Sequence, residues 1–238
     1  MPDVDLSDLF PGDAVIVRAA WFDSEPAPLL PDELRCVERA VPQRRHEFAA
    51  GRDCARRAFA QAGAPLEAAL LPGTDRAPIW PIGWLGSITH TRRNGRLFAA
   101  AVIANSERLA AVGIDAEPFL PAGADVAESV LTPAETTHLA RLNERGYKHT
   151  GEWVRAIFSA KEALYKAQPA HTRQTVGFDE VEIEFPEGLP ERDQSPFPFR
   201  YRRWDGLAGV GRVFCPAGLL ITGVQIPLPE VISPVNPW

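Results

Sequence analysis

Apolar residues along the chain follow helical spacing in some segments and strand-like runs in others. From Pro42 on, Phe48, Ala55 and Phe59 recur at helical spacing, and Gly63 follows the end of this helix. Elsewhere, short apolar runs bounded by turn residues predict strands. The first half is predicted to contain a strand at 14–22, helices at 32–40 and 42–62, and strands at 85–89, 97–104 and 110–114. Because short turns join the last three strands, we expect them to form one antiparallel sheet.

The second half repeats the order of helices followed by strands. It is predicted to contain helices at 124–131, 133–143 and 152–167, and strands at 176–185, 197–204, 208–214 and 219–226. Thr132 and Glu135 form a capping-box pattern at the start of the second helix. We expect an α+β fold of two similar halves in one fused unit, residues 1–117 and 118–238. Each half is a small antiparallel sheet packed with a long helix, and a ligand is expected in the cleft between the halves.

The composition narrows the classes of function. The chain has 238 residues, enough for one large domain or two small ones, and its net charge of −6 argues against nucleic acid as the main partner. Its longest apolar run, 97–104, is too short to span a membrane. The cysteines lack zinc-ligand spacing, and the N-terminal segment lacks the apolar core of a signal peptide. We therefore expect a cytoplasmic protein with reduced thiols.

Two acidic segments on rigid elements carry the candidate chemistry. Asp115 and Glu117 end a buried strand, and side chains alternate along a strand, so these two point the same way. On the helix 152–167, Glu162 and Lys166 share a face at i, i+4, next to Lys161. Each pattern alone is usually a solvated edge or a surface ion pair. The flanks here are apolar, and a divalent ion bound to phosphate is one natural partner for such carboxylates.

Two further segments contain donors suited to phosphate. Thr89 and His90 stand where a strand ends, and a hydroxyl, backbone N–H groups and a protonated imidazole can together hold an anion. Arg44 and Arg52 lie on the arginine-rich helix 42–62, and the forked donors of arginine suit phosphate. A structural histidine and a solvated arginine face are the plainer alternatives. The chain has no P-loop, Rossmann fingerprint or nucleophile elbow.

Taken together, these segments resemble the surfactin-type (Sfp-like) 4′-phosphopantetheinyl transferases, and look most like the bacterial group that includes enterobactin synthetase component D. The matching segments are RRHEFAAGRDCAR (44–56), RAPIWP (76–81), GSITHT (86–91), VGIDAEPF (112–119), LTPAE (131–135) and FSAKEALYKA (158–167). The resemblance implies a pseudo-twofold α+β monomer with coenzyme A between its halves. It also implies transfer of the 4′-phosphopantetheine arm of coenzyme A to a serine of an apo-carrier protein, with release of adenosine 3′,5′-bisphosphate.

The resemblance assigns metal-binding and catalytic roles. Asp115, Glu117 and Glu162 match the acids that bind Mg²⁺, for which Mn²⁺ is a substitute. Glu162 also matches the general base proposed for the serine hydroxyl. Lys161 and Lys166 match the lysines that contact the phosphates, with Lys166 near the reacting one.

The resemblance also assigns contacts to coenzyme A. Arg44, Arg52 and His90 match its phosphate contacts, and Thr89 adds a hydroxyl. Arg76 matches less closely, because the loop before Trp80 varies in length within the family. Two alternatives remain: a non-catalytic coenzyme A or phosphate-binding module, and another magnesium-dependent phosphotransferase. The carrier can be of the peptidyl, aryl, polyketide or fatty-acid class, and related enzymes often serve siderophore and other secondary pathways.

Overall fold

The computed structural model describes residues 4–144, 150–167, 177–185 and 195–229. In these residues it has an α+β fold with two antiparallel sheets, of order β1-β3-β2 and β4-β8-β7-β6-β5. The helices are α1 (Pro31–Val37), α2 (Pro42–Gln61), α3 (Ala124–Val130), α4 (Pro133–Glu144) and α5 (Thr150–Lys166). The strands are β1 (Val15–Phe22), β2 (Trp84–Arg93), β3 (Arg96–Asn105), β4 (Leu109–Pro118), β5 (Val181–Glu184), β6 (Phe197–Arg203), β7 (Ala208–Phe214) and β8 (Leu219–Pro227).

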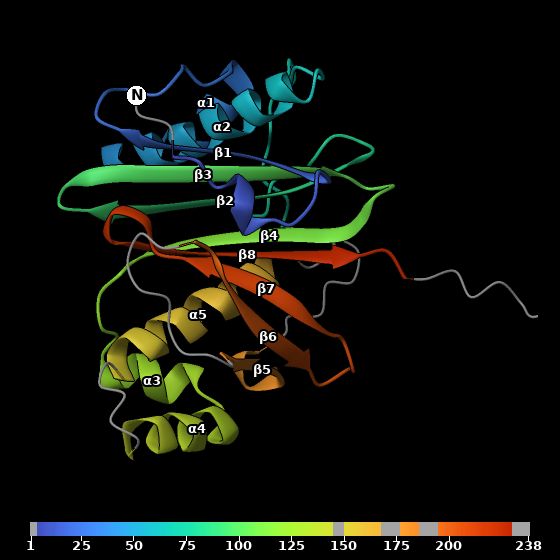
Figure 1. Ribbon diagram of the computed structural model, residues 1–238. Helices are drawn as coiled ribbons and strands as arrows, with labels where there is room; N and C mark the ends of the chain where they lie inside the picture. Colours follow the sequence, from blue (N-terminus) through green and yellow to red (C-terminus); the bar gives the residue numbers. More distant parts are fainter. Residues whose placement is uncertain (1–3, 145–149, 168–176, 186–194, 230–238) are drawn as a thin grey trace, which may run out of the picture.

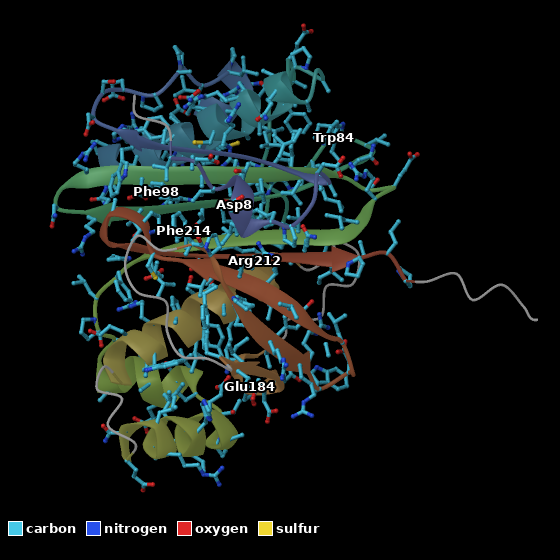
Figure 2. All side chains as sticks on the ribbon, in the orientation of Figure 1. Asp8, Trp84, Phe98, Glu184, Arg212 and Phe214 are labelled. Carbon is cyan, nitrogen blue, oxygen red and sulfur yellow. The ribbon has the colours of Figure 1, made fainter. Side chains whose placement is uncertain are left out.

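The elements form layers, with α2 outside the first sheet and α5 outside the second (Figure 1). Strand alternation decides which side chains fill each layer. In β3, Leu97, Ala99 and Ala101 join the core under α2, whereas Phe98 and its alternate neighbours join the core between the sheets. Phe214 packs against that same inter-sheet core from the second sheet (Figure 2). The core between the sheets therefore contains residues of both sheets.

The sheet partner expected for segment 110–114 was wrong. Strand β3 is paired along one edge by β1 and along the other by β2, so it has no edge left for β4. Strand β4 instead pairs with β8, placing Asp115 opposite Thr222. The other predicted helices and strands agree with the structure within a few residues, with two exceptions. Strand β2 continues to Arg93, so Thr89 and His90 lie within it and not at its end as expected. The strand expected at 176–185 begins only at Val181, after a short 3₁₀ turn. Residue 176 lies outside the described residues.

Side-chain hydroxyls join the two sheets where β2 runs beside β4. The backbone N–H of Ile114 donates to Ser87 Oγ at 3.2 Å, and the N–H of Ala116 donates to Thr89 Oγ1 at 3.0 Å. Ser87 and Thr89 are both buried, so these bonds satisfy backbone groups that water cannot reach. The expected boundary after Glu117 falls at the end of β4, and the division of the chain into two halves stays a proposal.

Helix α5 approaches β4 closely because residue 113 is glycine. A Cβ atom at Gly113 would lie 2.0 Å from the carbonyl oxygen of Ala163 and 2.9 Å from Cβ of Ala167. This contact brings the last turn of α5 next to Asp115. Among the described helices, none has both the length and the apolar character needed to cross a membrane.

Candidate active site

Elements of both sheets and helix α5 meet at Asp115. Its side chain lies on the face of β4 turned toward α5, and the residue is only 3% exposed. Lys166 Nζ donates to its Oδ1 at 2.5 Å, Ser159 Oγ donates to its Oδ2 at 2.8 Å, and Thr89 Oγ1 approaches Oδ1 at 3.4 Å. The first two donors come from α5 and the third from β2 of the other sheet. The structure therefore brings the two acidic segments together.

The three predicted metal-binding carboxylates influence one another. Burial raises the pKa of Glu117 to about 7, and the charge of Asp115 adds to the effect while Arg155 opposes it with an ion pair at 3.0 Å. Burial also raises the pKa of Glu162, again with Asp115 adding and Lys166 opposing. The positive charges of Arg155 and Lys166 therefore only partly offset the negative charges of the three carboxylates. Glu117 and Asp115 both face α5, as strand alternation predicted.

The carboxylates do not form a preassembled metal cage. Within the described ranges, no three His, Cys, Asp or Glu side chains are arranged to hold a metal ion. Mg²⁺ does not require such a cage, because it usually takes one or two carboxylates together with water and substrate phosphates. Carboxylate oxygens are the hard donors that this ion prefers, and a cation among them would offset the repulsion from Asp115 that contributes to the raised pKa values of Glu117 and Glu162.

Arg44 and His90 lie together on the first half, and His90 is near enough to Asp115 and Lys166 for their charges to affect its pKa. Arg44 Nη1 donates to His90 Nε2 at 2.9 Å, so the imidazole acts as an acceptor and is neutral in this arrangement. Burial lowers the pKa of His90. The positive charges of Arg44 and Lys166 lower it further, and the negative charge of Glu47 partly opposes them. The expected protonated imidazole is therefore not the form that the structure favours. Arg44 is exposed and can reach an incoming anion.

Arg52 and Arg76, also expected at coenzyme A, lie in different surroundings. Arg52 is 6% exposed, stacks over the Phe48 ring at 3.5 Å and donates from Nε to the Leu70 carbonyl at 3.3 Å. It thus fixes the chain at Leu70. Burial lowers the pKa of Arg52 to about 10. Arg76 lies on an exposed turn with φ of 67°, and no hydrogen bond or ion pair joins its side chain to another described residue.

Lys161 is separated from the other predicted site residues. It is 2% exposed, and its ammonium group donates to the Val130 carbonyl (2.8 Å), Glu135 Oε2 (2.8 Å) and the Phe178 carbonyl (2.7 Å). These three bonds use all three of its protons. The contact with phosphate expected for Lys161 therefore has no support in this arrangement. Glu135 also accepts from Thr132 N, which confirms the predicted capping box at the start of α4.

Sequence reasoning missed three residues of the site. Arg155 pairs with Glu117, while Ser159 and Thr222 stand behind Asp115. Ser159 lies inside the segment FSAKEALYKA and Arg155 lies shortly before it, so helical spacing from Glu162 could have suggested both. Thr222 has no local signal, because its position depends on the pairing of β4 with β8.

The expected cleft between the halves coincides with neither of two prominent cavities among the described residues. The first has a volume of about 750 Å³ and is lined mainly by β6–β8 and by the N-terminal residues 9–11. The second has a volume of about 710 Å³ and is lined by β5–β7 and α4. Neither is lined by a predicted site residue. At the junction of β2, β4 and α5, Lys166 forms an ion pair with Asp115.

Comparison with known proteins gives concordant matches along the chain. The family model for the 4′-phosphopantetheinyl transferase N-terminal domain matches residues 30–104, and that for the 4′-phosphopantetheinyl transferase superfamily matches residues 111–208. The chain is 36% identical to the 4′-phosphopantetheinyl transferase Svp of Streptomyces mobaraensis, over 90% of this chain and 86% of Svp. It is 38% identical to the 4′-phosphopantetheinyl transferase PptT of Mycobacterium tuberculosis, over 66% of this chain and 65% of PptT.

Replacing Lys161 tests whether it is structural. We expect Lys161→Met to destabilise the protein by about 3–5 kcal/mol, because Glu135 is left as a buried charge without its partner. The affinity of the folded fraction for adenosine 3′,5′-bisphosphate should stay at the wild-type value. Urea unfolding and calorimetric titration measure the two quantities. Unchanged stability with an affinity loss of about tenfold would instead make Lys161 a phosphate contact.

The neutral imidazole of His90 predicts a pH dependence of binding. Burial lowers the pKa of His90 in the free protein, and the negative charge of a bound phosphate should raise this pKa, so that His90 gains a proton on binding. Binding of adenosine 3′,5′-bisphosphate should therefore take up protons and strengthen as pH falls through the histidine range, about pH 8 to 5. Calorimetry in buffers of different ionisation enthalpy measures the uptake.

The uptake should disappear in His90→Gln and persist in His46→Gln, a matched control whose imidazole faces Arg92 instead. Equal uptake in wild type and His90→Gln would contradict the assignment.

Proposed function

The chain belongs to the 4′-phosphopantetheinyl transferase superfamily, and from this premise we propose that it moves the 4′-phosphopantetheine arm of coenzyme A onto a serine of an apo-carrier protein. The observation that carries the proposal is the convergence of Thr89, Asp115 and Lys166 on one buried point. Those residues come from segments matched by both family models. Neither half alone contains this arrangement.

Magnesium is the proposed metal, and Mn²⁺ its substitute. When bound, it would neutralise charge on the pyrophosphate of coenzyme A. Asp115, Glu117 and Glu162 supply hard oxygen donors that fit it, and their mutual repulsion favours a cation among them. Binding there would require Asp115 Oδ1 to exchange its contact with Lys166 for one with the metal.

The surrounding cations are proposed to bind the phosphates of coenzyme A. Lys166, whose ammonium group lies 2.5 Å from Asp115, is assigned to the reacting phosphate. Arg44 and His90 are assigned to the other phosphates, with Thr89 adding a hydroxyl. Arg52 and Arg76 remain weaker proposals, because one is buried against Leu70 and the other stands on an exposed turn.

In the proposed transfer, the serine oxygen forms a bond to the β-phosphorus and the bond to the leaving adenosine 3′,5′-bisphosphate breaks. Glu162 is the proposed acceptor of the serine proton. It is half-buried, and within the described part of the chain its carboxylate has no hydrogen-bond partner. Its raised pKa brings it nearer to neutral pH, which suits a general base.

Finer features of the protein remain proposals. The motifs favour the surfactin-type branch near enterobactin synthetase component D, and a peptidyl, aryl or acyl carrier. The core shared between the sheets supports a monomer, because each half covers the apolar face of the other. A cytoplasmic location, and a role in siderophore or other secondary pathways, rest on the cysteine pattern and on family tendency.

A transfer assay tests the proposed function directly. Purified protein, coenzyme A and Mg²⁺ are incubated with apo-carriers of the peptidyl, aryl and acyl classes, and intact masses are measured. At least one carrier should gain one 4′-phosphopantetheine group, and chelation of divalent metal should stop the gain. Binding of coenzyme A with no mass gain on any carrier would support the non-catalytic alternative.

Replacing Glu162 tests its role as the base. We expect Glu162→Gln to lower kcat by about 10²-fold or more, the usual contribution of a positioned base, while coenzyme A still binds. The exposed acid Glu128 on α3 offers a control, since Glu128→Gln removes one negative charge outside the site. A Glu162→Gln variant with full turnover and unchanged metal affinity would remove Glu162 from the mechanism.

A further inference from the structure

Two buried hydroxyl groups stand behind Asp115, on the side away from Lys166. Ser159 and Thr222 both have 0% exposure. Ser159 Oγ lies 2.8 Å from Asp115 Oδ2 and 2.8 Å from Thr222 Oγ1, and Thr222 Oγ1 lies 2.8 Å from the carbonyl oxygen of Ser159. Buried hydroxyls need partners, and these two satisfy each other and one oxygen of the carboxylate.

The direction of these hydrogen bonds follows from the number of protons. Each hydroxyl carries one proton, while an ionised carboxylate and a carbonyl can only accept. Ser159 must therefore give its proton to Asp115 Oδ2. Thr222 must give its proton to Ser159, through either the carbonyl or the hydroxyl oxygen. With the carboxylate as the acceptor, the whole arrangement is directed toward Asp115.

The backbone fixes both hydroxyls in place. Thr222 is the direct cross-strand partner of Asp115 in the pairing of β4 with β8. Ser159 precedes Glu162 by three residues and Lys166 by seven, so all three side chains lie on one face of α5. The close packing of α5 on Gly113 holds that face against β4. The hydroxyl pair is thus as rigid as the two strands and the helix that carry it.

We propose that Ser159, supported by Thr222, is a positioning residue that fixes Asp115 Oδ2 and thereby keeps Oδ1 directed at Thr89 and Lys166, where the metal and the phosphates are proposed to bind. This inference rests on the proposed function. Without the hydroxyl, the carboxylate can rotate and exchange its two oxygens, which weakens a contact that needs one oxygen in one place. Hydrogen-bonding partners of metal ligands typically act in this way.

Variants that remove or keep a hydroxyl test the proposal. Ser159→Ala should weaken Mn²⁺ binding in the presence of coenzyme A by about 10- to 100-fold, the usual effect of losing such a partner. The loss is measured by paramagnetic resonance of free Mn²⁺, without a carrier. Ser159→Ala should also lower kcat while leaving the KM for the carrier unchanged. Thr222→Val should show a smaller loss, and Thr222→Ser, which keeps the hydroxyl, should restore wild-type values.

Ser87→Ala provides the matched control. Ser87 is also a buried serine, but its hydroxyl bonds to the backbone of Ile114 on β4 and not to Asp115. This variant should lose some stability in urea and keep the wild-type affinity for Mn²⁺. If Ser159→Ala does not fold, Ser159→Cys, of similar size and a weaker donor, replaces it and should also weaken Mn²⁺ binding.

The outcomes separate this inference from the proposed function. If the wild-type protein modifies no carrier and binds no Mn²⁺ with coenzyme A, the proposed function fails. If the wild type does both, and Ser159→Ala keeps its affinity for Mn²⁺ and its kcat, the positioning role alone is overturned. Loss of stability in Ser159→Ala with unchanged affinity per folded molecule likewise overturns it.

Discussion

The structure depends on the compensation of one buried negative charge, that of Asp115. A carboxylate at 3% exposure is costly unless charged and polar partners surround it. Here those partners come from three elements: Thr89 on β2, and Ser159 and Lys166 on α5. The two sheets must therefore meet at this residue, and α5 must pack closely on β4, before the charge is stabilised. Folding of the two halves and assembly of the site are in this sense the same event.

On each of two helices, one cationic side chain is buried by packing and another lies at the proposed site. On α2, Arg52 is buried against Phe48 and Leu70, whereas Arg44 is exposed and bonds to His90. On α5, Lys161 uses all its donors within the second half, whereas Lys166 reaches Asp115. The Lys161 ammonium links the end of α3, the start of α4 and Phe178, so it fixes the helix from which Glu162 and Lys166 project. The motif thus contains one lysine that holds the helix and one that contacts Asp115.

Local patterns predicted much of this arrangement. Apolar periodicity located most helices and strands, and strand alternation placed Asp115 and Glu117 on one face. The pairing of segment 110–114 with β8 could not be predicted from turn length, because it depends on β1 occupying the other edge of β3. The burial of Lys161 and the contact of Thr222 with Ser159 likewise depend on packing between segments distant in sequence. All three features are set by contacts between segments distant in the sequence, which local sequence patterns do not reveal.

A crystal structure of the protein with coenzyme A and Mn²⁺, using anomalous scattering from manganese, tests the central claim most directly. The account predicts one manganese peak bound by Asp115 Oδ1 and at least one of Glu117 and Glu162, with a pyrophosphate oxygen of coenzyme A completing the contact. Ser159 should remain on Oδ2, and Lys166 should have moved from Asp115 to a phosphate. A manganese peak away from these carboxylates, or coenzyme A bound elsewhere while the Lys166–Asp115 pair stays intact, would contradict the account.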